Sequence, residues 1–276
     1  MNLSYYIVRT LTETGLIRLF NFNITFKLNY RNFKIPFRGS KMGTEILGMG
    51  ESWFLPIVND LIPQNKKIEN VCFVDVGMNI GQTLLKIKDS FPSIHFLGFE
   101  PNPICVSYLH ELIKINNLEN VNVLPVGVAD QTGVLTLNAD NEFASGASMI
   151  ENFRKNQVIK FRYNCPVFNS ELISNFHPSG LDVIKIDVEG FELNVIQGLL
   201  PMIKKYRPSI ICEVLPNYGN QESDRFKRQV LLQELLASID YSIFRINESS
   251  HTLYEINEFG IFHDMDQTNY VFKPTS

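Results

Sequence analysis

Residues 73–83 read Phe-Val-Asp-Val-Gly-Met-Asn-Ile-Gly-Gln-Thr (FVDVGMNIGQT). The first half is an apolar run typical of a buried strand, and the second half is a short loop that contains Gly77 and Gly81. Glycines at such positions allow a tight turn and let a ligand approach the backbone closely. The stretch therefore predicts the entrance to a nucleotide-type cofactor site, with Asp75 near the end of the strand and Asn79 in the loop.

Two classes of ligand compete for this loop. A dinucleotide places its pyrophosphate over the N-terminus of the following helix, and its loop is typically Gly-x-Gly-x-x-Gly. Asp75 beside a phosphate cluster would be an unfavourable like-charge contact, and Asn79 stands where that loop has glycine. S-adenosylmethionine has no phosphate, and an acid can stabilise its sulfonium and ammonium groups. Asp75 therefore favours the methyl donor, with an NAD-dependent oxidoreductase as the alternative.

A second acid follows the next apolar run, in Gly98-Phe99-Glu100-Pro101. Glu100 lies 25 residues beyond Asp75, close to the offset expected of an acid that binds a ribose diol. Pro101 ends the strand and leaves the carboxylate at its tip. Both ligand classes contain a ribose, so Glu100 supports a ribose site without choosing between them.

The remaining pattern predicts an α/β fold with a mostly parallel sheet covered by helices on both faces. Short apolar runs alternate with segments of helical period, and such runs are typical of strands buried on both faces. Between 127 and 180 extra strands and a loop replace the expected helix, and the tail from 251 is expected to add one or two antiparallel edge strands. The expected strands are 71–76, 94–99, 121–126, 181–186, 209–214 and 241–246, and the expected helices are 81–90, 103–116, 190–205 and 222–238.

The N-terminal part differs from the rest, so we divide the chain into a cap of residues 1–70 and a main domain of residues 71–276. The cap pattern indicates a first helix, a hairpin with Tyr30-Arg31-Asn32 near its turn, and a second helix that begins near Ser52. No segment approaches the roughly 20 apolar residues of a membrane span. The N-terminal residues also lack the apolar core and cleavage site of a signal peptide.

Composition narrows the class of protein. The chain has 276 residues, 45% of them hydrophobic, and a net charge of −4, which makes a nucleic-acid partner unexpected. The four cysteines are widely spaced without a Cys-x-x-Cys pair, so we expect buried thiols, no zinc site and a cytoplasmic location. The sequence does not predict the oligomeric state.

At this point the sequence resembles a known family. The segments FVDVGMNIGQT, GFEPNP, VGVAD and IKIDVEGFELNVIQG together are similar to the FkbM-type S-adenosylmethionine-dependent methyltransferases, over roughly residues 70–215. The resemblance implies a class I methyltransferase (Rossmann-like) fold, with a seven-stranded sheet that has one antiparallel edge strand. It also implies O-methylation, commonly of sugar hydroxyls in glycans, glycolipids or glycosylated natural products. The residues that match the methionine-end loop are Asp75, Gly77, Asn79 and Gly81, and Glu100 matches the ribose acid.

Asp130 matches the family region beside the adenine. An Asx turn in Ala-Asp-Gln-Thr-Gly is an equally good reading of this residue. The segment Phe143–Met149 is small and polar, and it is expected either to pass over the cofactor or acceptor, with Ser145 and Ser148 as donors, or to be a plain hairpin connection.

Candidate catalytic residues follow the fourth expected strand, in Leu-Asp-Val-Ile-Lys-Ile-Asp-Val-Glu-Gly. Alternation places Lys185, Asp187 and Glu189 on one side of this strand. Methyl transfer to a hydroxyl needs a base within hydrogen-bond reach, and we expect Asp187 or Glu189 in that role, with Glu213 as a further candidate. Lys185 is expected to be a structural partner of these acids. No metal is expected, and a non-catalytic binding module of the same fold remains possible.

Overall fold

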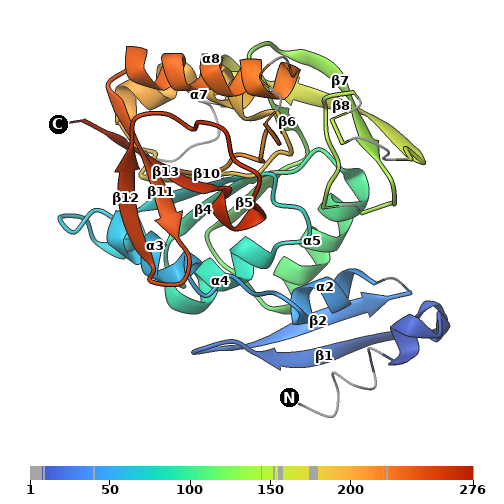
Figure 1. Cartoon of the computed structure of the whole chain (residues 1–276). Coiled ribbons are helices and arrows are strands. Elements are labelled where there is room, and N and C mark those ends of the chain that lie inside the picture. Colours follow the sequence, from blue (N-terminus) through green and yellow to red (C-terminus); the bar gives the residue numbers. More distant parts are fainter. Residues whose placement is uncertain are drawn as a thin grey trace.

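The computed structural model describes residues 8–275 except 9, 40, 144, 152, 155–157, 174–179, 220 and 222. Its centre is an eight-stranded sheet with the strand order β12-β11-β13-β10-β9-β3-β4-β5 (Figure 1). The strands are β3 (Cys72–Val76), β4 (His95–Phe99), β5 (Val121–Leu124), β9 (Val183–Ile186), β10 (Ser209–Glu213), β11 (Tyr241–Asn247), β12 (Thr252–Ile256) and β13 (Asn269–Pro274). All six strands predicted before residue 250 are confirmed.

The sheet is mostly parallel, as predicted, but it has eight strands instead of seven. Strands β10, β9, β3, β4 and β5 pair in parallel, whereas β13 is antiparallel to both β10 and β11. The extra strand β12 pairs with β11 in an antiparallel hairpin and forms the edge. The tail therefore supplies one edge strand, and its second strand is inserted between β10 and β11.

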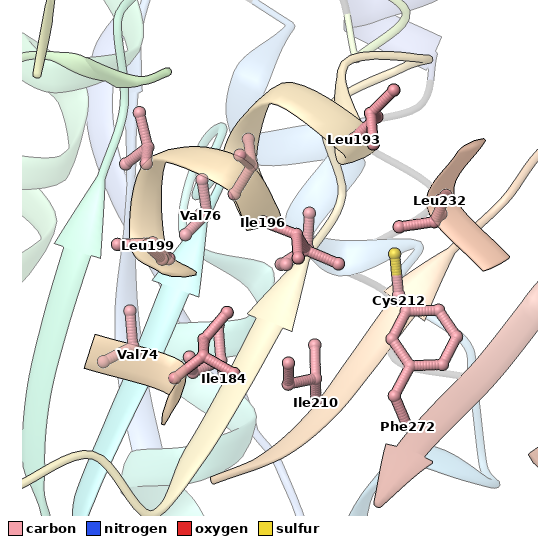
Figure 2. Close-up of a cluster of buried hydrophobic side chains, with 14 of the residues drawn as sticks. Val74, Val76, Ile184, Leu193, Ile196, Leu199, Ile210, Cys212, Leu232 and Phe272 are labelled. Carbon is pink, nitrogen blue, oxygen red and sulfur yellow. The ribbon is translucent and has the colours of Figure 1, made fainter. Parts of the chain in front are cut away.

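Helices cover both faces of this sheet because its strands are apolar on both sides. On one face Val74, Ile184 and Ile210 pack under Leu193, Ile196 and Leu199 of α7 (Figure 2). On the other face Phe73 and Val183 pack against α3, α4 and Leu109 of α5. Each fully buried Leu or Ile contributes about 2 kcal/mol through the hydrophobic effect. The helices are α3 (Phe54–Leu61), α4 (Gln82–Ser90), α5 (Pro103–Ile115), α7 (Glu192–Tyr206) and α8 (Asp224–Ser238).

An N-terminal hairpin packs against α4 and α5, away from the central sheet (Figure 1). Strands β1 (Asn21–Lys27) and β2 (Asn32–Arg38) form the predicted hairpin, followed by the short helix α2 (Met42–Leu47). Phe33, Ile35 and Phe37 of β2 share one buried cluster with residues of α4 and α5. Most of the predicted first helix lies outside the described residues, although residues 10–13 are helical.

A second, three-stranded sheet fills the interval between β5 and β9. Its strand order is β6-β8-β7, with β6 (Gly127–Val128), β7 (Gly133–Ala139) and β8 (Phe161–Phe168), and the short helix α6 (Ser170–Ile173) follows. In the segment Phe143–Met149, Ser148 forms one antiparallel bridge with Asn138. Over the described parts of the chain, no helix is long and apolar enough to cross a membrane.

Candidate active site

A cavity opens at the carboxyl edge of the sheet, with about 980 Å³ of space that includes the solvent at its mouth. It is lined by residues from the loop after β3, the loop after β4, strand β6 and the loop after β9, together with Ser145, Ala147 and Met149. Parallel α/β sheets bind ligands at this edge. The segments that carry the predicted site residues therefore meet at one place.

The glycine loop has the backbone conformation that its sequence predicts. Gly77 has a φ of 89°, and a Cβ atom there would lie 2.0 Å from the carbonyl oxygen of Asp187. Asn79 has a φ of 48°, in the left-handed region that asparagine tolerates better than most residues. The position that looks irregular for a dinucleotide loop is thus occupied by a residue suited to its conformation.

The loop's backbone N–H groups are already engaged. Gly77 and Met78 donate to the carbonyl oxygen of Phe99, at 3.0 and 3.2 Å. Asn79 donates to Oε2 of Glu100 at 2.7 Å. A pyrophosphate needs several free N–H groups at this position, so these bonds favour a ligand without phosphate.

Glu100 is buried at the tip of β4 and lines the cavity. Its two carboxylate oxygens accept hydrogen bonds from the N–H groups of Asn79 and Asn102, at 2.7 and 2.8 Å. Burial raises the pKa of Glu100 to about 7, although both hydrogen bonds oppose this shift. Each oxygen keeps a lone pair for a further donor, as binding to a ribose diol requires. Pro101 and Asn102 line the cavity beside it.

Asp75, Lys185 and Asp187 form a buried charge cluster at the ends of β3 and β9. Lys185 Nζ lies 3.0 Å from Asp187 Oδ2 and 3.8 Å from Asp75 Oδ1. Asp75 is fully buried, and neither of its carboxylate oxygens has a hydrogen-bond partner within the described structure. Burial raises the pKa of Asp75 to about 7, and the charge of Lys185 only partly offsets it. Lys185 is thus the structural partner that the sequence predicted, but it also lines the cavity.

Asp187 is the more accessible acid of this cluster, with 38% of its side chain exposed. Burial alone would raise its pKa, but the charge of Lys185 and its hydrogen bonds lower the pKa below the ordinary value. One of these bonds joins Asp187 to Glu213. Burial and the charge of the nearby Asp187 raise the pKa of Glu213 to about 9. At neutral pH Glu213 therefore carries the proton and Asp187 the negative charge.

Glu189 also lines the cavity, but its carboxylate is already paired. Its Oε2 lies 2.6 Å from a guanidinium nitrogen of Arg154, and its carbonyl accepts a hydrogen bond from Ser148 Oγ at 2.7 Å. Burial raises the pKa of Glu189, while the bond to Arg154 opposes the shift. Glu189 has a φ of 51°, a strained conformation that these contacts hold in place. Of the two predicted serines, Ser145 lines the cavity and Ser148 supports this loop from below the surface.

Asp130 is not placed on the cavity. It is exposed, and Asn194 of α7 donates to its Oδ1 at 3.1 Å. The chain turns away from the cavity at Ala129, whose N–H donates to Phe168 and whose carbonyl packs against α7 at Gly198. Gly127 and Val128 line the cavity instead, so the position of Asp130 does not support contact with an adenine.

Several lining residues are absent from the sequence-based set. The apolar ones include Val128, Leu137, Met149 and Phe191, which come from separate parts of the chain. Glu51 comes from the loop before α3, and its Oε2 lies 2.6 Å from Lys86 Nζ. All four cysteines are buried, and Cys105 lines the cavity.

These groups suit the parts of S-adenosylmethionine. Glu100 offers acceptors for a ribose diol and apolar side chains line part of the cavity. The fully buried Asp75 does not line the cavity, so its unpartnered carboxylate could act on a cationic group only through its charge. Among the described residues, no group of three His, Cys, Asp or Glu side chains could hold a metal ion. The sheet and its cavity define the class I methyltransferase fold.

Comparison with known proteins gives the same class. Residues 75–246, well over half of the chain, match the family described as the methyltransferase FkbM domain. The chain is 27% identical over 157 residues to Methyltransferase sdnD of Sordaria araneosa, which covers 47% of this chain and 61% of that protein. It is 26% identical over 144 residues to Methyltransferase 1 of Beauveria bassiana (strain ARSEF 2860), covering 46% of this chain and 57% of that protein. The matches thus span about three-fifths of these two relatives.

A solved structure of an FkbM methyltransferase from Methylobacillus flagellatus KT is also similar, at 15% identity and a TM-score of 0.46. That match covers 84% of this chain and 57% of the other chain. The chain belongs to the FkbM family of S-adenosylmethionine-dependent methyltransferases.

Proposed function

We propose that this protein is an S-adenosylmethionine-dependent O-methyltransferase that acts in the cytoplasm on a sugar hydroxyl of a glycan, glycolipid or glycosylated natural product. The observation that carries the proposal is one cavity that joins the ribose-type acid Glu100 to the ionised acid Asp187. Bound S-adenosylmethionine would supply an electrophilic methyl group. The protein's task is then to hold the donor, orient the hydroxyl oxygen behind the methyl carbon, and accept the proton that the hydroxyl loses.

Cofactor binding would fall to residues of β3, β4 and the loops that follow them. Glu100 would accept hydrogen bonds from the ribose hydroxyls, with Pro101 and Asn102 beside it. Gly77, Asn79 and Gly81 would shape the loop around the methionine end, and Asp75 would act on the cationic end through its charge. These roles are supported by the burial of both acids and by the way the loop's N–H groups are used internally.

Asp187 is the better of the two predicted bases. It lines the cavity, remains partly exposed and is held ionised by Lys185, so at neutral pH it has the unprotonated form that a general base requires. Glu189 is buried and paired with Arg154, which suits a positioning role for the loop after β9. The hydrogen bond from Glu213 orients the Asp187 carboxylate. The acidic net charge disfavours a nucleic-acid acceptor.

Calorimetric titration with S-adenosylhomocysteine tests the cofactor site. The wild-type protein is expected to bind it, and Glu100→Ala is expected to weaken binding at least 100-fold, because two ribose hydroxyls lose a charged acceptor, worth about 3 kcal/mol. Glu119→Ala, which removes an exposed glutamate, is the matched control. Unchanged affinity in Glu100→Ala would remove the ribose assignment. Binding of NADH without binding of S-adenosylhomocysteine would support the oxidoreductase alternative.

Transfer of a radiolabelled methyl group to a panel of methyl glycosides tests the activity. Asp187→Asn is expected to lower kcat at least 100-fold, as typical for loss of a general base, while affinity for S-adenosylhomocysteine stays within about threefold. Cofactor binding without transfer to any hydroxylated acceptor would point to a non-catalytic binding module. Transfer to an amine instead of a hydroxyl would overturn the assignment as an O-methyltransferase.

A further inference from the structure

A second hollow, of about 580 Å³, opens directly beside the cofactor cavity. It lies between α2, the loop that ends at Glu51, and α4. Glu51 and Gln82 line both spaces, so the two are adjacent at this point. We call the second hollow the acceptor groove; its residues are Thr44, Glu45, Gly48, Met49, Gly50, Glu51, Gln82 and Lys86.

The groove joins the cavity at the end that contains the charge cluster. Burial is the main cause of the raised pKa of Asp75, and the charges of Asp187 and Glu51 add to it, which places Glu51 within electrostatic reach of Asp75. Lys185 and Asp187 line the same cavity as Glu51, whereas Glu100 marks its ribose end. A molecule in the groove therefore approaches the donor from the side of the proposed base.

Glu51 is held so that its carboxylate faces this junction. Its Oε2 lies 2.6 Å from Lys86 Nζ, and the Lys86 side chain is only 8% exposed whereas that of Glu51 is 52% exposed. The Lys86 ammonium also lies 5.6 Å from the centre of the Phe54 ring, which fixes it further. Glu51 has a φ of 64°, a strained conformation for a non-glycine residue. A buried cation and a strained backbone thus fix a carboxylate that remains open to the cleft.

We propose that the acceptor groove binds the sugar acceptor as an uncharged, hydroxyl-rich saccharide, and that Glu51 accepts a hydrogen bond from one of its hydroxyl groups. The inference rests on the proposed function and adds the place and charge class of the acceptor. The charge of Lys86 balances that of Glu51, so the groove has one net negative charge, that of Glu45. This negative charge disfavours an acidic sugar. Most groove residues precede residue 75, so acceptor choice lies outside the part of the chain that matches the family.

Filling the groove tests this directly. A Cβ atom at Gly50 would have no neighbour within 4 Å, and Gly50 does not have a positive φ, so Gly50→Trp places an indole in open space without backbone strain. Gly133→Trp is the matched control, because Gly133 is equally open, also lacks a positive φ and lines neither the groove nor the cavity. Glu51→Gln tests the hydrogen bond separately.

The measurement is saturation-transfer NMR of the methyl glycosides of glucose, galactose and rhamnose, with the protein saturated by S-adenosylhomocysteine. The wild type and Gly133→Trp are expected to show a saturation-transfer signal for at least one glycoside. Gly50→Trp is expected to lose this signal, and Glu51→Gln is expected to reduce it at least fivefold. Calorimetry on the wild type, Gly50→Trp and Gly133→Trp is expected to give S-adenosylhomocysteine affinities within twofold of one another.

The outcomes separate this inference from the proposed function. The groove assignment would be overturned if the wild type showed no saturation transfer to any glycoside, or if Gly50→Trp showed as much as the wild type. Calorimetry would still report on the cofactor site in either case. A saturation-transfer signal that both Gly50→Trp and Glu51→Gln abolish would support the groove. If the glycoside that binds is nevertheless not methylated in the activity assay, the O-methyltransferase function would be contradicted.

Discussion

Two buried acids, Asp75 and Glu100, have the same raised pKa but different surroundings. Glu100 is satisfied by two backbone N–H groups, whereas Asp75 has no hydrogen-bond partner in the described structure and depends on Lys185 at 3.8 Å. An uncompensated buried charge is costly, so the ionised form of Asp75 lowers the stability of the folded protein. Such residues are concentrated at functional sites, which agrees with a role for Asp75 near a cationic ligand.

Asp75 should make folding stability depend on pH. A raised pKa means that the folded state binds the proton more tightly than the unfolded state, so stability is highest below pH 3.8 for this group and falls as pH rises to about 7. Between pH 4 and pH 8, the wild type should lose up to about 4 kcal/mol relative to Asp75→Asn. Urea denaturation of both proteins across this range measures the difference.

The control for that series is Asp60→Asn, which changes an exposed aspartate. Its stability should run parallel to that of the wild type at every pH. Parallel curves for Asp75→Asn as well would show that Asp75 has an ordinary pKa and that Lys185 compensates its charge fully.

Among the elements, the turn of the hairpin β1–β2 is hydrogen-bonded to α4 through the side chain of Asp89. The Asp89 carboxylate accepts hydrogen bonds from the backbone N–H groups of Asn29, Tyr30 and Arg31, at distances of 2.7 to 3.3 Å. Asp89 is 3% exposed, so these bonds are shielded from water. The hairpin in turn packs beside α2, one wall of the acceptor groove.

Asp89→Ala should lower the free energy of unfolding by about 3 kcal/mol, because three N–H groups lose a charged acceptor. Hydrogen exchange at residues 29–31 should accelerate much more than exchange in β3. Asp60→Ala is the control and should leave both quantities unchanged. Equal protection of the turn in Asp89→Ala would mean that the apolar contacts of β2 alone hold the hairpin.

Considering the whole molecule, the cap of residues 1–70 and the main domain share buried surface. Phe33, Ile35 and Phe37 pack with Leu85, Tyr108 and Leu112, and Tyr108 donates a hydrogen bond to the carbonyl of Pro36 at 3.1 Å. Trp53 and Phe54 of the cap pack with Phe73 of β3. Residue 70 is therefore proposed as a boundary of function, between acceptor and donor binding, and not as a boundary between independently folding units.

Thermal unfolding should accordingly be a single cooperative transition. Trp53, the only tryptophan of the chain, is 3% exposed and reports on the cap by fluorescence, while far-UV circular dichroism reports mainly on the central sheet and its helices. The two midpoints should agree within about 2 °C. A fluorescence transition that precedes the circular dichroism transition by several degrees would show that the cap unfolds by itself.

Much of the donor site follows from local sequence. The strands were recognisable because a run apolar on both faces is stable only inside a covered parallel sheet, and Gly77, Asn79 and Glu100 occupy positions whose backbone demands are local. Because these strands run parallel, their carboxyl ends also lie at the same edge of the sheet. The predicted strands and the gathering of most site residues therefore followed from sequence alone.

Other features depended on contacts between distant segments. Asp130 leaves the site because Ala129 donates a hydrogen bond to Phe168 and its carbonyl packs against α7. Glu189 differs from Asp187 because Arg154, 35 residues away in the sequence, pairs with Glu189, whereas Asp187 pairs with its near neighbour Lys185. Glu51 enters the cleft because Lys86 of α4 draws its carboxylate inward. Sequence patterns record local conformation and burial, whereas the pairing of charges and the shape of a cleft arise only when separate elements pack together.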